Sequence, residues 1–259
     1  MEPQNHVICC LGNSRLSAYL KDLPSSYQFL TFSRSLENNL SQSEYKFELT
    51  LENMEKQIEQ LPFQGTLFIS LTPIRNQTKE IWEKFFELYG NKFHQVVLIS
   101  TTSVYEVSQE HHCDIVESSP RVPDHPMVIT EDIVLKYFPR AIILRPSGLF
   151  DHGSHPIKFL AGKENAYENL SGTVNLVHRE DLARAALFLL ENKFAGIFNV
   201  SFPENPNKAS YYHQAAQTFG LELKGNKDSA PAYPSKSINT KKLLSLGYRY
   251  QYDINQVNS

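Results

Sequence analysis

A hydroxyl-rich turn at residues 99–105 (ISTTSVY) carries side chains able to do chemistry. It follows a predicted strand at 95–100. A hydroxyl there can polarise a carbonyl or hydroxyl oxygen of a substrate through a short hydrogen bond. Thr101 and Tyr105 are therefore candidate catalytic residues, with core packing as the alternative for Tyr105. His178 is a third candidate, and Asp181 is expected to cap a helix over 181–190.

A possible phosphate-binding turn lies near the start of the chain. Residues 10–15 (CLGNSR) match the spacing of G-x-G-x-x-G with the middle glycine only, since Cys10 and Arg15 replace the outer two. Gly12, Asn13 and Arg15 are candidate cofactor-binding residues on this basis. Arg15 either points outward and holds a phosphate or fills the space of the cofactor. A plain strand–turn–helix is the alternative for the whole turn.

The end of the second predicted strand carries Ser33, Arg34 and Ser35. Enzymes that prefer NAD place an acidic residue here for the ribose diol, whereas an arginine can accept the 2′-phosphate of NADP. The three residues are candidate cofactor-binding residues, with a solvated loop as the alternative. Leu71, Thr72 and Pro146 complete the expected cofactor-binding set, since ligands of such sheets gather where strands end.

No metal site is expected. The cluster at residues 111–114 (HHCD) consists of adjacent side chains that cannot easily face one ion, and no complementary C-x-x-C or H-x-x-x-H occurs. The chain also contains no G-x-S-x-G and no H-E-x-x-H, which argues against the hydrolase and zincin classes.

Short apolar runs alternate with amphipathic stretches along the first two thirds of the chain, which predicts βαβ units in a doubly wound parallel sheet. The expected fold class is α/β, a Rossmann-like core with a small C-terminal substrate-side subdomain. We expect the core at 1–150, with 175–200 completing the sheet, and small substrate-side segments at 151–174 and 201–259. The expected strands are 6–11, 28–32, 45–49, 66–71, 95–100, 141–145 and 196–200. The expected helices are 14–23, 51–61, 78–89, 131–137, 181–190, 211–219 and 240–246.

Composition narrows the choice of partners. The 259 residues include 25 Lys and Arg against 28 Asp and Glu, a net charge of −3, so no basic surface for nucleic acid is expected. No apolar run approaches the roughly 20 residues that cross a bilayer, and three cysteines without paired spacing suit a reducing compartment. We expect a cytoplasmic monomer or homodimer that binds a small molecule, without nucleic acid or membrane partners.

Six short motifs follow one another along the later part of the chain. They are ISTTSVYE (99–106), RPSGLF (145–150), LAGK (160–163), VNLVHREDLA (174–183), FNVS (198–201) and LGYRYQY (246–252). Together they resemble the extended short-chain dehydrogenases/reductases, the NAD-dependent epimerase/dehydratase superfamily, and most of all its YeeZ-like branch. The resemblance covers most of residues 66–252 and places Thr101 at the family's catalytic Ser/Thr position. It implies an NAD(P)-binding protein with a substrate similar to a nucleotide sugar.

The chain departs from this family at one essential motif, Tyr-x-x-x-Lys, whose tyrosine is the general acid/base. By register against Glu131, the pair should lie at Pro123 and Met127, and none of the 13 tyrosines has a lysine four residues later. His125 lies near the vacated position and can titrate near neutrality, or it is a loop histidine. Three hypotheses stay open: an NAD(P)-dependent enzyme with another acid/base group, a dinucleotide-binding protein without hydride chemistry, and a pseudoenzyme whose cleft is filled.

Overall fold

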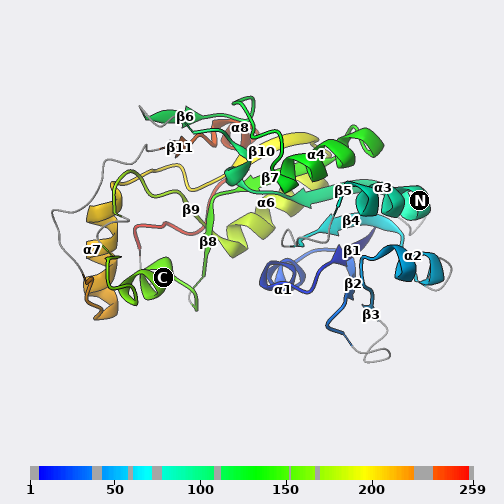
Figure 1. Cartoon of the computed structure of the whole chain (residues 1–259), viewed down its shortest axis with the longest axis horizontal. Coiled ribbons are helices and arrows are strands. Elements are labelled where there is room, and N and C mark those ends of the chain that lie inside the picture. The colour runs from blue at the N-terminus through cyan, green and yellow to red at the C-terminus, as the bar shows by residue number, and fades with distance from the viewer. Residues whose placement is uncertain are drawn as a thin grey trace. The chain divides into compact units, whose positions relative to one another are not determined.

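The structure is a computed structural model that describes residues 6–36, 43–57, 61–71, 78–107, 112–151, 153–166, 170–224 and 236–256. The chain forms two compact units, each assembled from separate stretches of sequence (Figure 1). The first unit comprises Met1–Val104, Val122–Arg145 and Ala183–Ile197, and the second comprises Tyr105–Arg121, Pro146–Leu182 and Phe198–Ser259.

The main sheet has seven strands in the order β10-β7-β5-β4-β1-β2-β3. The pairs from β3 through β7 are all parallel. Strands β1 and β4 are buried along their whole length, which explains their continuous apolar sequences. The bounds are β1 Val7–Leu11, β2 Gln28–Ser33, β3 Glu44–Lys46, β4 Gly65–Ile69, β5 Phe93–Ile99, β7 Ile142–Pro146 and β10 Gly196–Val200.

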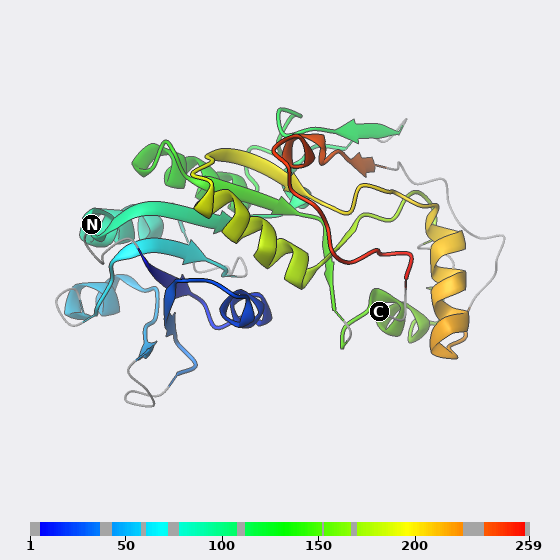
Figure 2. The same ribbon diagram turned by 180° about the vertical axis from the view of Figure 1, so that it is seen from behind.

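The order of the strands creates a switch point between β1 and β4. From β1 the chain moves toward β2 through α1 (Arg15–Asp22), and from β4 it moves the opposite way to β5 through α3 (Lys79–Tyr89). Right-handed crossovers then place these helices on opposite faces of the sheet, as Figure 2 shows. In such sheets a crevice opens where the strands at the switch point end.

Three further elements complete the first unit. Helix α2 (Leu51–Gln57) and helix α4 (Pro126–Tyr137) both pack against α3, and a 3₁₀ turn, η2 (Gly90–Lys92), leads into β5. Beneath them, Phe63 lies at the centre of an aromatic cluster, with its ring centroid 4.2 to 6.0 Å from those of five other rings. The five are Phe32, Phe47, Phe85, Tyr89 and Phe93.

The second unit contains two small two-stranded sheets, β11-β6 and β8-β9, and a separate hydrophobic core. Its strands are β6 Cys113–Ile115, β8 Gly148–Phe150, β9 Leu176–His178 and β11 Lys236–Ile238. Its helices are α5 Pro156–Ala161, α7 Lys208–Phe219 and α8 Lys241–Ser245. Helix α6 (Arg179–Glu191) has residues in both units, and η3 (Thr102–Val104) ends the first stretch of the first unit.

The structure confirms the expected fold class and corrects two local predictions. Helix α4 begins at Pro126 rather than at Glu131, because proline suits the first helical position and His125 caps it. Asp181 does not cap α6: it lies inside the first turn and accepts hydrogen bonds from the backbone N–H groups of Gln251 (2.8 Å) and Tyr252 (3.1 Å). None of the helices described is long and apolar enough to cross a membrane.

Candidate functional site

A pocket of about 340 Å³ lies at the switch point of the first unit, where β1, β2 and β4 end. Six of the predicted cofactor-binding residues line it: Gly12, Asn13, Ser33, Arg34, Ser35 and Leu71. Pro146 is the buried last residue of β7, and Thr72 lies outside the described residues. The residues predicted from three separate strand ends therefore line one pocket.

Gly12 is essential to the turn that follows β1. Its φ is +113°, and a Cβ there would lie 3.1 Å from the carbonyl oxygen of Ser70 and 3.1 Å from Cδ2 of Leu71. Its N–H donates to the Phe32 carbonyl over 2.9 Å. Any side chain at this position would be strained and crowded, so the turn keeps the backbone open to the pocket.

The residues that replace the two outer glycines leave the pocket open. Cys10 is fully buried inside β1, where burial raises the pKa of its thiol to about 12, so the thiol stays neutral. Arg15 is the exposed first residue of α1 and is not among the lining residues. Of the two readings of Arg15, the structure therefore disfavours the one in which it fills the cleft.

The start of α1 is organised by a capping box. The Ser14 hydroxyl accepts the Ser17 N–H (3.2 Å), and the Ser14 N–H donates to the Ser17 hydroxyl (2.8 Å). The Ser14 hydroxyl also lies 3.1 Å from that of Ser70, which follows β4. These bonds fix the two strand ends that border the pocket.

The far side of the pocket combines a cation with a carboxylate. Arg34 is exposed, and the hydroxyls beside it, on Ser33 and Ser35, lie 3.1 Å apart. Glu48 and Thr50, which follow β3, also line the pocket, and the Glu48 carboxylate accepts from Nδ2 of Asn53 (3.3 Å). Sequence reasoning missed Glu48, because the third predicted strand, 45–49, includes it. In the structure β3 ends at Lys46, and Glu48 follows the strand end as Arg34 follows β2.

Thr101 is half-buried just after β5, outside the lining of the pocket. Its Oγ1 lies 3.0 Å from the Ser103 hydroxyl and accepts the Ser103 N–H over 3.1 Å.

Met127, at the position expected for the family's lysine, is buried in the first turn of α4, and Pro123 precedes that helix. The carbon and sulfur side chains at these two positions cannot donate or accept a proton as the dyad does.

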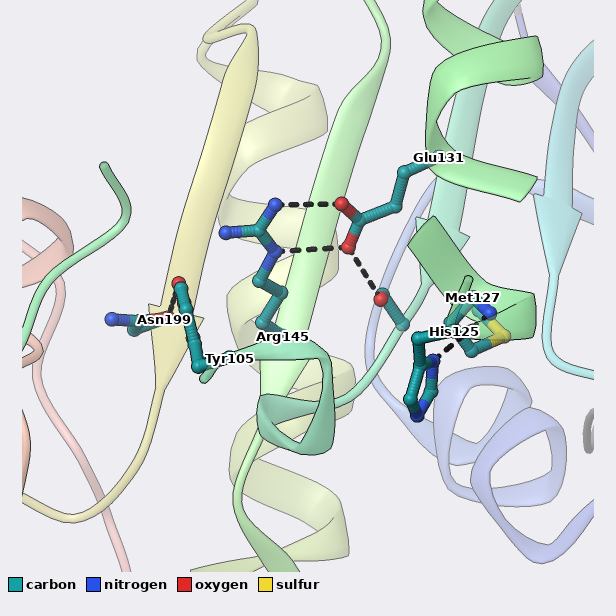
Figure 3. Close-up of polar contacts among 7 residues, drawn as sticks. Tyr105, His125, Met127, Glu131, Arg145 and Asn199 are labelled. Atoms are coloured by element: carbon teal, nitrogen blue, oxygen red, sulfur yellow. Dashed lines mark hydrogen bonds and ion pairs between the residues drawn. The ribbon is translucent and has the colours of Figure 1, made fainter. Parts of the chain in front are cut away.

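A buried ion pair lies directly behind this strand end. Arg145 donates from Nε and Nη2 to the two carboxylate oxygens of Glu131, over 2.9 and 2.6 Å (Figure 3). The Ser100 hydroxyl donates to the same carboxylate over 2.5 Å, and all three residues are buried. The pair thus anchors the residue before Thr101 to α4 and β7.

The other two catalytic candidates lie in the second unit and have structural contacts. Tyr105 is 2% exposed, and its hydroxyl donates to Oδ1 of Asn199 over 2.6 Å (Figure 3). His178 is 1% exposed, stacks on Tyr252 with ring centroids 3.8 Å apart, and accepts the Glu180 N–H at Nδ1. These contacts favour the packing alternative for Tyr105 and a capping role for His178.

Within the described part of the chain, no group of three or more His, Cys, Asp or Glu side chains could hold a metal ion. His111, from the HHCD cluster, lies outside that part.

The Rossmann-like fold matches that of solved structures described as epimerases and dehydratases. A putative NAD-dependent epimerase/dehydratase from Methylobacillus flagellatus superposes with a TM-score of 0.74, at 14% identity, over 96% of this chain and 94% of that one. RMD from Pseudomonas aeruginosa, solved in complex with NADPH, gives a TM-score of 0.71 at 16% identity over 96% of both chains. No family model matches the sequence.

A closer likeness in sequence is to Protein YeeZ of Escherichia coli K12, which is 34% identical over 170 residues. The matched region is 63% of this chain and 60% of the length of YeeZ. The chain is thus similar in sequence to part of YeeZ and shares its fold with a putative epimerase/dehydratase, in line with the resemblance seen in its motifs.

Proposed function

We propose that the first-unit pocket binds a nicotinamide dinucleotide, NADP(H) in preference to NAD(H), in an epimerase/dehydratase/reductase-like protein. The observation that carries the proposal is the pocket itself, at the switch point, with an open backbone at Gly12 and a cation at Arg34. The family resemblance suggests a small-molecule substrate similar to a nucleotide sugar.

The lining residues suit the parts of a dinucleotide. The turn at Gly12 admits a pyrophosphate close to the backbone, and Arg15, exposed at the start of α1, can pair with its charge. Arg34, with the hydroxyls of Ser33 and Ser35, suits the 2′-phosphate of NADP. Glu48 would instead favour the free ribose diol of NAD, so Arg34 and Glu48 together set the preference.

When bound, the dinucleotide would supply the hydride chemistry of this class. The chain's own contribution would be Thr101, whose hydroxyl polarises a substrate oxygen. A second candidate function is dinucleotide binding without hydride transfer. It is favoured by Pro123 and Met127, which leave the family's acid/base position without a titratable side chain.

Calorimetric titration with NADPH and NADH tests this proposal. We expect tight NADPH binding, which Arg34→Ala weakens about tenfold or more while changing NADH binding little, because one ion pair to the 2′-phosphate is lost. Glu48→Gln should weaken NADH selectively. Arg15→Gly should weaken both dinucleotides equally, because they share the pyrophosphate.

Arg140→Ala is the matched control, because Arg140 is exposed in the same unit but lies outside the pocket. Absence of heat and of any rise in melting temperature at millimolar dinucleotide would contradict the proposal. An equal loss of both dinucleotides in Arg34→Ala would refute the 2′-phosphate role alone.

A further inference from the structure

A continuous chain of hydrogen bonds runs from the first turn of α4 to Thr101. The backbone N–H of Met127 donates to Nδ1 of His125 over 3.1 Å, as Figure 3 shows. Nε2 of His125 lies 3.2 Å from the Ser103 hydroxyl, which lies 3.0 Å from Oγ1 of Thr101. All four residues belong to the first unit.

The helix cap fixes the direction of this chain at its origin. Because Nδ1 of His125 accepts the Met127 N–H, it carries no proton, and the proton of the neutral ring is on Nε2. That nitrogen can therefore only donate, and the hydrogen bond runs from His125 to Ser103.

The same cap occurs at His155, whose Nδ1 accepts the Ile157 N–H over 3.2 Å at the start of α5. There Nε2 meets the Tyr211 hydroxyl inside the core of the second unit, over 3.0 Å. The cap is thus a structural device that the chain uses repeatedly. What distinguishes His125 is that its second nitrogen leads to a half-buried threonine at a strand end.

The hydroxyl of Ser103 can carry this direction on to Thr101. Its oxygen accepts from His125, which leaves its own hydrogen available for Oγ1 of Thr101, 3.0 Å away. Oγ1 of Thr101 also accepts the Ser103 N–H over 3.1 Å. A hydroxyl has one donor and two acceptor sites, so in this arrangement both acceptor sites of Thr101 are used and its hydrogen is left for a ligand.

We infer that the hydrogen bonds take this direction, and that His125 is a positioning residue, which acts through Ser103 to hold Thr101 as a hydrogen-bond donor. The atom bound at Thr101 is then an acceptor, a carbonyl or carboxylate oxygen, and not an ammonium or other donor-only group. Placing this ligand in the reaction of the protein rests on the proposed function. No proton has to leave His125, because a preorganised donor stabilises negative charge on the ligand oxygen without proton transfer.

Nitrogen NMR of protein labelled in its histidine rings tests the first hydrogen bond of this series, from the Met127 N–H to His125, without any ligand. At pH 7.5 we expect His125 with a protonated Nε2 and a bare Nδ1, as also expected for His155. A proton on Nδ1 of His125 would overturn the inference. Ser103→Ala should shift the His125 Nε2 signal and leave that of His155 unchanged; an unchanged His125 signal would also overturn it.

Small probe ions test the donor at Thr101. We expect acetate to shift the Thr101 and Ser103 amide signals saturably, and methylammonium to leave them unchanged. His125→Asn keeps a capping oxygen and removes the ring donor, so it should weaken acetate binding about tenfold. His155→Asn is the matched control and should keep the wild-type affinity.

Three results would each overturn the inference. They are equal responses to the two ions, no response to acetate, and wild-type acetate affinity in His125→Asn. The wild-type measurements decide it even if a variant does not fold. A different result would refute the proposed function instead. If NADPH does not bind but the expected tautomer and acetate response are observed, the donor role of Thr101 stands without the dinucleotide.

Discussion

Glu131 and Arg145 are both fully buried and contact one another through two hydrogen bonds. Removing two charges from water is costly, and the cost is offset only where geometry is good and the remaining polar atoms are satisfied. Here the second contact of the carboxylate is the Ser100 hydroxyl, one residue before Thr101. The pair therefore connects the stability of the first unit to the position of its candidate catalytic hydroxyl.

Glu131→Gln should lower the free energy of unfolding by about 3 to 5 kcal/mol, because it leaves the Arg145 charge buried without a carboxylate. Urea denaturation measures this change. Replacing both partners, as Glu131→Leu with Arg145→Met, should recover much of the loss.

Lys136→Ala is the control, since its ion pair with Glu83 is 3.1 Å long and solvent-exposed and should contribute little. If Glu131→Gln and Lys136→Ala had equally small effects, the buried pair would not stabilise the fold as described.

At the scale of elements, three helices begin in the same way. A histidine precedes α4, α5 and α6, and in each case its Nδ1 accepts the N–H two residues later. The histidines are His125, His155 and His178. A cap of this kind requires a bare ring nitrogen, so protonation of the histidine removes the hydrogen bond and places a positive charge at the positive end of the helix.

His155 should make stability depend on pH. Burial, followed by the charge of Lys158, lowers the pKa of His155 from 6.5 to about 4 in the folded protein. The unfolded chain therefore binds more protons between these values, and stability present above pH 6.5 is lost as pH falls toward 4. The full effect is about 3 kcal/mol.

Urea denaturation at pH 7.5 and at pH 4.5 checks this prediction in wild type and in His155→Asn, which retains a capping oxygen. The wild type should lose more stability than the variant over this interval. Parallel losses in the two proteins would rule out His155 as the source.

At the scale of the whole molecule, the chain crosses between its two units several times, so neither unit is a continuous segment. The proposed dinucleotide pocket belongs entirely to the first unit. The second unit has its own core, in which Tyr211 and Tyr212 of α7 pack with Ile157 and Leu160 of α5. A ligand of the pocket should therefore act first on the unit that holds it.

Hydrogen exchange with and without NADPH should show this division. We expect slower exchange at residues 11–16, 32–36, 47–50 and 70–71, because these segments line or adjoin the pocket. Exchange in α7 should change little. Protection of α7 equal to that of the pocket segments would contradict binding confined to the first unit, and Arg34→Ala should reduce the protection by NADPH.

The sequence by itself determined the parallel sheet and six of the residues that line the pocket. Apolar runs such as β1 and β4 and amphipathic stretches such as α3 are local patterns, and their periodicity follows from the geometry of one element. Because ligands gather at strand ends in such sheets, the positions of Gly12, Arg34 and Leu71 at or just after the ends of predicted strands were enough to place them in the pocket.

Only the tertiary structure decided which distant residues meet. Strands β6 and β11 are three residues long and pair across more than a hundred positions, and periodicity is not detectable over three residues. His125 meets Ser103, and Glu131 meets Arg145, because crossovers bring separate segments to one edge of the sheet. Hydrogen-bond direction depends on such contacts, so the role of His125 requires its contact with Ser103 as well as the nearby Met127 N–H.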